Sequence, residues 1–147
     1  MPKLDLDTIP ATDHTFYPPP YNEAVQGRWV RRLAPAAGLS DFGASHVTLK
    51  PGAWSAQRHW HEGEDEFVVI VSGEATLIDD SGEHPMRPGD CAAFPKGDGN
   101  GHALRNDGAQ DCVFVAVGRV PTTDCHYPDI DLHLTIGRGF HPKERTD

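Results

Sequence analysis

The sequence has few basic residues, no long apolar run and no opening signal pattern. It carries 13 Lys and Arg against 22 Asp and Glu in 147 residues, a formal charge of −9. So acidic a chain repels phosphate backbones, and we expect no nucleic-acid partner. No apolar stretch reaches the roughly 18 residues that a membrane helix needs, and no basic-then-apolar segment opens the chain. These absences predict a cytoplasmic protein without a membrane partner.

Cysteine is also scarce. The three cysteines, Cys91, Cys112 and Cys125, are odd in number and widely spaced. They fit neither a disulfide framework nor a CxxC zinc site, so we expect reduced thiols. Cys91 and Cys112 lie in apolar, strand-like runs, where a small buried side chain is the simplest interpretation.

Glycine and proline, in contrast, are abundant, with 15 and 13 residues. From Arg28 onward, about nine short apolar segments follow one another at spacings near ten residues, each ended by turn residues such as Pro51-Gly52. Helical periodicity of useful length is missing. This rhythm predicts an all-β sandwich or barrel.

The rhythm also divides the chain. Residues 1–27 contain Tyr17-Pro18-Pro19-Pro20, which cannot be helical, and are expected to form an extended N-terminal arm. Residues 28–121 are expected to form the barrel. Residues 122–147 are polar and lose the strand rhythm, so they are expected to form a C-terminal arm and tail.

Two histidines stand two residues apart just before an apolar strand. Residues two apart in a strand face the same side, so His59 and His61 project together and form half of a metal site. Glu66 begins the next strand, and antiparallel pairing could bring its carboxylate beside the two imidazoles. A second segment offers His102 after a Gly-rich turn.

These two segments resemble the two sequence motifs of the cupin superfamily. The matching residues are Gly52, His59, His61, Glu66 and Gly73 in the first motif and Gly89, Pro95, Gly97, His102 and Asn106 in the second. One extra residue stands between Gly52 and His59, and four residues instead of two separate Gly97 from His102, which enlarges the turn before His102. The resemblance implies a cupin-type double-stranded β-helix (jelly-roll) barrel with extended arms, and a homodimer.

The resemblance also implies a metal site. In cupins the matching side chains bind a divalent metal, which here implies the ligands His59, His61, Glu66 and His102. Imidazoles and one carboxylate suit Fe, Mn, Ni, Cu or Zn, with positions left open for substrate or water. Glu64 and Asp65 are alternatives for the carboxylate. Glu66 is preferred because it leads directly into the apolar strand.

Two further residues are candidates for catalysis. Gln57 is expected on the same strand face as His59 and His61, because the three residues are spaced two apart, and it could line the pocket. His46 could act as an acid or base, although a lone strand histidine is more often simply accommodated. Weaker candidates for a lid are Tyr17, Tyr21, His126 and Tyr127.

Two classes of function remain open. One is a metal-dependent enzyme acting on a small polar organic molecule, either a dioxygenase or an isomerase or lyase. The segments HWHEGEDEFV, FPKGDGNGHALRN, VAVGR and YPDIDL resemble bacterial single-domain cupins described as sugar-phosphate-isomerase-like. The sequence has no obvious phosphate clamp, although Lys96, Arg105 and Arg119 could converge. The alternative is a non-catalytic cupin that binds a metal or a small ligand, as a sensor or binding module.

Overall fold

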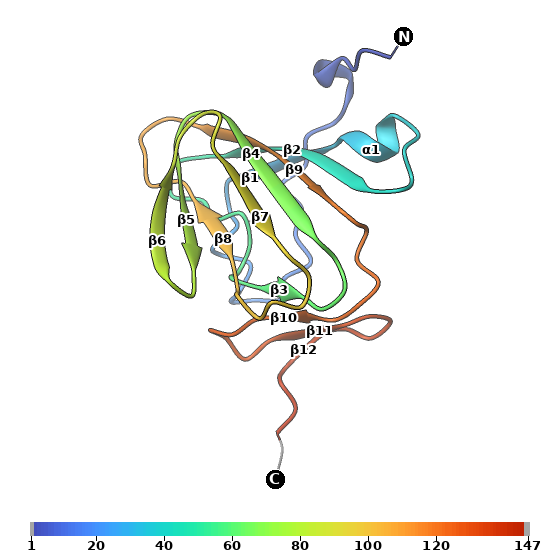
Figure 1. Cartoon of the computed structure of the whole chain (residues 1–147), viewed down its shortest axis with the longest axis vertical. Coiled ribbons are helices and arrows are strands. Elements are labelled where there is room, and N and C mark those ends of the chain that lie inside the picture. The colour runs from blue at the N-terminus through green and yellow to red at the C-terminus, as the bar shows by residue number, and fades with distance from the viewer. Residues whose placement is uncertain (1, 146–147) are drawn as a thin grey trace.

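The computed structural model describes residues 2–145, and nearly all of its regular elements are β-strands (Figure 1). The strands are β1 (Arg28–Arg32), β2 (Gly43–Leu49), β3 (Trp60–His61), β4 (Glu66–Ser72), β5 (Ala75–Asp79), β6 (Gly82–Met86), β7 (Cys91–Phe94), β8 (Ala103–Arg105), β9 (Cys112–Gly118), β10 (Cys125–His126), β11 (His133–Thr135) and β12 (Gly139–His141). The helical elements are a 3-10 turn, η1 (Leu6–Thr8), and α1 (Leu33–Ala36). Within the described residues, no helix is long and apolar enough to cross a membrane. The all-β prediction is confirmed.

The strands form three antiparallel sheets. The largest has the order β1-β2-β9-β4-β7, the second β12-β11-β10-β3 and the third β6-β5-β8. In the largest sheet, β9 lies between β2 and β4 although both precede it in the chain, a crossover typical of jelly-roll folds. Figure 1 shows the second sheet at the lower end of the molecule, below the other two.

The core lies on the inner faces of the large sheet and the β6-β5-β8 sheet. Because every second side chain of a strand points to the same face, alternate residues of β2, β4 and β9 supply most of it. The buried apolar residues from these three strands are Val47, Leu49, Val68, Ile70, Cys112 and Phe114. They pack against Met86 and Leu104 of the smaller sheet. This alternation reproduces the predicted strand pattern.

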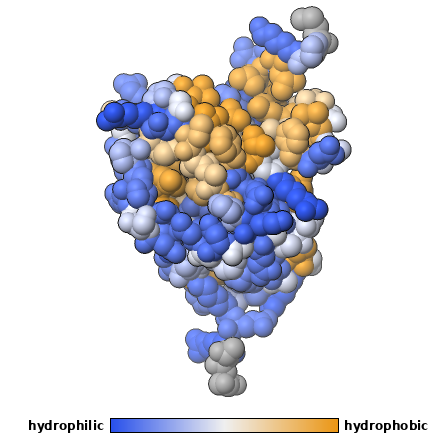
Figure 2. Space-filling model, viewed as in Figure 1, coloured by the Kyte–Doolittle hydropathy of each residue, from blue (hydrophilic) through white to orange (hydrophobic). Residues whose placement is uncertain are grey.

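The outer face of the large sheet carries exposed apolar side chains. Phe67 and Val71 on β4 are 42% and 52% exposed. Figure 2 shows apolar side chains gathered over the upper part of the molecule and hydrophilic ones over its lower part. Cys91, expected to be buried, is exposed because it points outward from the edge strand β7. The homodimer stays a prediction.

The C-terminal segment forms strands that its sequence did not indicate. β10 pairs with β3, and β11 and β12 extend the same sheet. Strands of two or three residues are too short to show a period of two. A small apolar cluster of Cys125, Tyr127 and Leu132 packs against Tyr17 and Tyr21 of the N-terminal segment. The boundaries at 27 and 121 stay a prediction.

The close packing of the turn after β4 against the start of β9 can be tested at Gly73. Gly73 has φ +70°, and a Cβ there would lie 2.9 Å from Cys112 Cα and would also meet the Asp111 carbonyl. Gly73→Ala should therefore lower the free energy of unfolding by more than the roughly 1–2 kcal/mol that the left-handed backbone costs.

Urea unfolding measures this loss. Gly38→Ala is the matched control, because Gly38 has φ +73° and nothing lies within 4 Å of its Cβ position. An equal loss in the two variants would contradict the importance of the close approach.

Candidate metal centre

The structure brings three histidines and one acid of the two motifs together. Nε2 of His59 lies 3.5 Å from Glu66 Oε1, and Nε2 of His102 lies 3.5 Å from Glu66 Oε2. His61 Nε2 also contacts Glu66 Oε1. One potential ligand atom from each of His59, Glu66 and His102 lies within 4.8 Å of the other two. The four side chains thus form one cluster.

Backbone pairing positions the cluster. His59 and His102 form an antiparallel bridge, in which each amide donates to the other carbonyl, at 3.1 and 2.9 Å. Their ring centroids are consequently only 4.6 Å apart. Glu66, the first residue of β4, pairs with Phe94 on one side and Gly118 on the other. The Phe94 ring stacks on the His102 ring at 3.6 Å.

The polar atoms of the cluster fit a cation. Glu66 Oε1 and His102 Nε2 are buried and lack a hydrogen bond of normal geometry. Leaving such atoms unpaired costs roughly 1–3 kcal/mol each, and a bound cation would satisfy them. Nitrogen and carboxylate donors suit Zn, Fe, Mn and Ni. This His/Glu cluster could therefore hold a divalent metal.

The charge states of Glu66 and His102 also suit metal ligation. Burial opposes ionisation of Glu66, but the adjacent imidazoles of His102, His59 and His61 outweigh burial and hold the pKa of its carboxyl well below the usual range. Burial lowers the pKa of His102. A carboxylate and a neutral imidazole are the forms that bind metals. His61 differs: burial opposes its charge, but Cys125 and Glu66 outweigh burial and raise its pKa to about 10, so His61 must release a proton to bind a metal.

The structure separates the three acids that compete for the carboxylate position. Glu64 is 2% exposed and accepts hydrogen bonds from the backbone amides of Thr122 and Thr123, at 2.6 and 2.9 Å. Asp65 accepts from the amide of Lys96 at 2.8 Å. Glu66 is the acid whose carboxylate meets the three histidines, while Glu64 ties the C-terminal segment to the barrel.

The side chains of Gln57 and His46, the two candidates for catalysis, lie outside the His/Glu cluster. Gln57 Nε2 donates to the carbonyl of Tyr21 at 2.9 Å, and the Gln57 carbonyl lies 2.8 Å from His59 Nδ1. This carbonyl directs Nε2 of His59 toward the cluster. His46 lines a hollow on the outer face of the large sheet with Trp29 and Arg31. There, burial and then the charge of Arg31 lower its pKa.

Two arginines line the cavity beside the cluster, and sequence reasoning missed both. The cavity has a volume of about 260 Å³ and is lined by Arg28, Val30, Arg32, Ser45, Val47, Ser55, Ala56, His59, Glu66, Val68, Phe94, His102, Leu104, Phe114 and Ala116. Arg28 Nη1 donates to the carbonyl of Ser55 at 2.8 Å, while its buried Nε has no partner. Alternation along β1, which turns residues 28, 30 and 32 to one face, was the available signal.

Among the described residues, the three cations that the sequence suggested as a phosphate clamp do not line this cavity. Arg105 pairs with Asp107 and Glu83. Lys96 does not line this cavity in the described part of the chain, and Arg119 lines a second hollow of about 270 Å³ together with Arg32, His61 and Glu66. Positive charge therefore reaches the cavity from β1.

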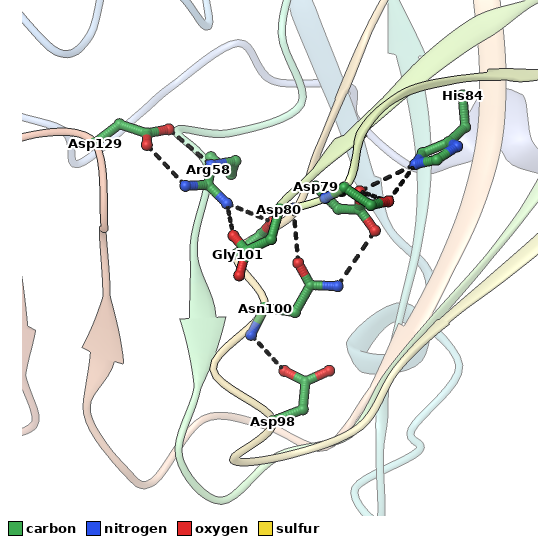
Figure 3. A network of polar contacts seen from close by, with 9 residues as sticks. Arg58, Asp79, Asp80, His84, Asp98, Asn100, Gly101 and Asp129 are labelled. Atoms are coloured by element: carbon green, nitrogen blue, oxygen red, sulfur yellow. Dashed lines mark hydrogen bonds and ion pairs between the residues drawn. The ribbon is translucent and has the colours of Figure 1, made fainter.

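An ion-pair network holds the enlarged turn before His102 (Figure 3). Arg58 donates to both carboxylate oxygens of Asp129 at 2.7 Å, contacts Asp80, and donates to the carbonyl of Gly101 at 3.1 Å. Asn100 accepts from the Asp80 amide at 2.8 Å. Arg58 thus joins the C-terminal segment, the β5–β6 hairpin and the turn that leads to His102.

The different environments of Glu64 and Glu66 give opposite expectations. Glu64→Gln should lower the free energy of unfolding by about 1–3 kcal/mol, because buried donors of Thr122 and Thr123 lose a charged acceptor. Glu66→Gln should leave folding near wild type but weaken zinc or manganese binding. Chemical unfolding and equilibrium dialysis with these ions measure both; similar effects of the two variants would refute the assignment.

The Arg58 network generates a second expectation. Arg58→Ala should cost about 1–2 kcal/mol of folding free energy, a modest value because its aspartate partners are exposed. Loosening the turn before His102 should also weaken metal binding by about 10-fold, a change typical of losing support for a ligand. Arg138→Ala, which removes an exposed pair with Glu144, is the control. Unchanged metal affinity in Arg58→Ala would reject the link to His102.

Comparison with known proteins agrees with this architecture. The family model of the cupin domain matches residues 45–118. A crystal structure described as a sugar phosphate isomerase from a cupin superfamily, from Silicibacter pomeroyi, is 46% identical with a TM-score of 0.90, covering 98% of this chain and 93% of that one. A polyketide cyclase from Streptomyces resistomycificus shares the fold, with 19% identity, a TM-score of 0.66 and coverage of 80% and 78%.

A further relative matches only half of this chain. The oxalate-binding protein of Thermotoga maritima is 34% identical over 73 residues, which are 50% of this chain and 58% of that protein. The family match, the jelly-roll strand order and both motifs agree. The chain belongs to the cupin family.

Proposed function

We propose that this cupin is a metal-dependent enzyme for a small polyhydroxy substrate with an anionic group, and that it isomerises a sugar phosphate. The observation that carries the proposal is the presence of Arg28 and Arg32 in the same cavity as His59, Glu66 and His102. The similarity to the Silicibacter pomeroyi protein, 46% identical over 98% of this chain, supports this reaction class.

The proposed ligands are His59, His61, Glu66 and His102, and the proposed ions are Zn, Mn, Ni or Fe. When bound, such an ion polarises a substrate oxygen and stabilises negative charge that develops on it. The Gln57 carbonyl keeps His59 in the orientation that ligation requires.

The cavity walls contribute binding and charge. Arg28 and Arg32 would bind the anionic group of the substrate, because guanidinium groups pair well with phosphate and carboxylate oxygens. The contact between Arg28 and the Ser55 carbonyl fixes the direction of its guanidinium. Val47, Val68 and Phe114 form an apolar wall that excludes water and strengthens these charge interactions.

Metal analysis and turnover test the proposal together. The wild type should hold about one divalent metal per chain and interconvert at least one aldose and ketose phosphate in an NMR assay, whereas His59→Ala should lose both properties. Arg32→Ala should raise KM for the phosphorylated substrate at least about 10-fold.

Arg31→Ala is the matched control, since Arg31 is the neighbouring residue on β1 but faces the outer hollow. Turnover that persists in metal-free His59→Ala would overturn the mechanism. An equal rise of KM in Arg31→Ala and Arg32→Ala would overturn the role of the cavity arginines.

A second candidate is an anion-binding cupin without turnover. The similarity to the oxalate-binding protein of Thermotoga maritima favours it. It predicts heat of binding for oxalate by calorimetry, dependent on the metal and on Arg32, and no product from any sugar phosphate.

A further inference from the structure

We propose that Cys125 is a further donor to the metal, so that a thiolate joins the imidazoles and the carboxylate of the centre. The inference rests on the proposed function, because it requires that the centre binds a metal. Cys125 belongs to neither cupin motif and comes from β10, in the C-terminal segment.

Strand pairing turns Cys125 toward the histidines. β10 and β3 are antiparallel, with Cys125 opposite His61 and His126 opposite Trp60. Side chains of directly opposed residues share a face of the sheet. His126 and Trp60 stack with ring centroids 4.1 Å apart, on the face opposite to Cys125 and His61.

The next inward residue of this segment follows the same alternation. Tyr127 lies two residues beyond Cys125, and its ring centroid is 5.9 Å from that of His59. Cys125 and Tyr127 therefore face His61 and His59 as two neighbouring pairs. Strand register therefore fixes the face of the sheet on which the thiol lies.

The donor atoms are within reach of one ion. One potential ligand atom from each of His59, His61 and Cys125 lies within 4.8 Å of the other two. Bonds of about 2.1 Å to nitrogen and 2.3 Å to sulfur place the donors of one zinc ion at most about 4.4 Å apart. Small side-chain adjustments would complete the set. His59 belongs to this set and to the set with Glu66 and His102, so the two sets adjoin at one histidine.

The three cysteines differ in surroundings. Cys112 is buried in the main apolar core, where it packs as a small hydrophobic residue, and Cys91 is exposed on an edge strand. Cys125 is 1% exposed and lies beside two imidazoles. His61 Nδ1 is buried 3.9 Å from Glu64 Oε2 and has no hydrogen-bond partner. This polar, enclosed environment distinguishes a donor thiol from a packing thiol.

Thiolate ligation has two consequences. A soft donor favours zinc, iron, cobalt or copper over manganese and magnesium, which narrows the choice of metal. The thiol proton leaves to solvent when the metal–sulfur bond forms. Because Cys125 lies on β10, the bound metal would also tie the C-terminal sheet to the barrel.

Cobalt(II) provides a spectroscopic test with the full chain. Metal-free protein loaded with one equivalent of Co(II) under argon should show an intense thiolate-to-cobalt charge-transfer absorption in the near ultraviolet. Cys125→Ser should lose this absorption while still binding cobalt, and its zinc affinity should fall at least about 10-fold. Cys112→Ser and Cys91→Ser should keep both properties.

The outcomes separate the two proposals. Cobalt binding by the wild type without charge-transfer absorption, or retention of that absorption in Cys125→Ser, would overturn the thiol ligand and leave the metal centre intact. A wild type that takes up neither cobalt nor zinc would overturn both proposals.

A measurement on the wild type covers the case in which Cys125→Ser fails to fold. X-ray absorption of the zinc-loaded wild type should contain a sulfur neighbour at about 2.3 Å. A shell of nitrogen and oxygen alone would reject the thiol ligand.

Discussion

The antiparallel bridge between His59 and His102 is the contact on which the rest of the site depends. It joins the two cupin motifs through a reciprocal pair of backbone hydrogen bonds and places the two rings 4.6 Å apart. Glu66 then needs only its position at the start of β4 to meet both rings. Backbone geometry is stiffer than side-chain geometry, so a site held this way is organised before any ligand arrives.

Buried charge has opposite meanings at two neighbouring acids. Glu64 receives a full set of donors from Thr122 and Thr123, which is how a buried carboxylate serves structure. Glu66 meets imidazoles and retains a buried oxygen without a normal hydrogen bond. Because unsatisfied buried polar atoms are costly, they mark a place where a ligand would stabilise the protein. The unpartnered Nε of Arg28 likewise marks the adjoining cavity as a place where a ligand would stabilise the protein.

The C-terminal segment is bound to the elements that carry the candidate ligands. Its short strands pair with β3, Glu64 fixes its beginning, and Arg58 binds Asp129 further along. These contacts join it to the same elements that carry the histidines. The candidate metal centre, the turn before His102 and the docked strand β10 are therefore connected, since each shares residues with the next.

The sequence alone determined the all-β fold, because turn spacing and a period of two are local properties. The four candidate ligands came from the resemblance to the two cupin motifs. The sequence favoured Glu66 over Glu64 as the carboxylate ligand, which stays a prediction; in the structure Glu66 is the acid that contacts all three histidines. Sheet pairing decided what alternation cannot: that Arg28 and Arg32 of β1 face the cavity and that Cys125 lies opposite His61. Alternation tells which residues of one strand share a face. Only the tertiary structure determines which other strands lie beside that strand.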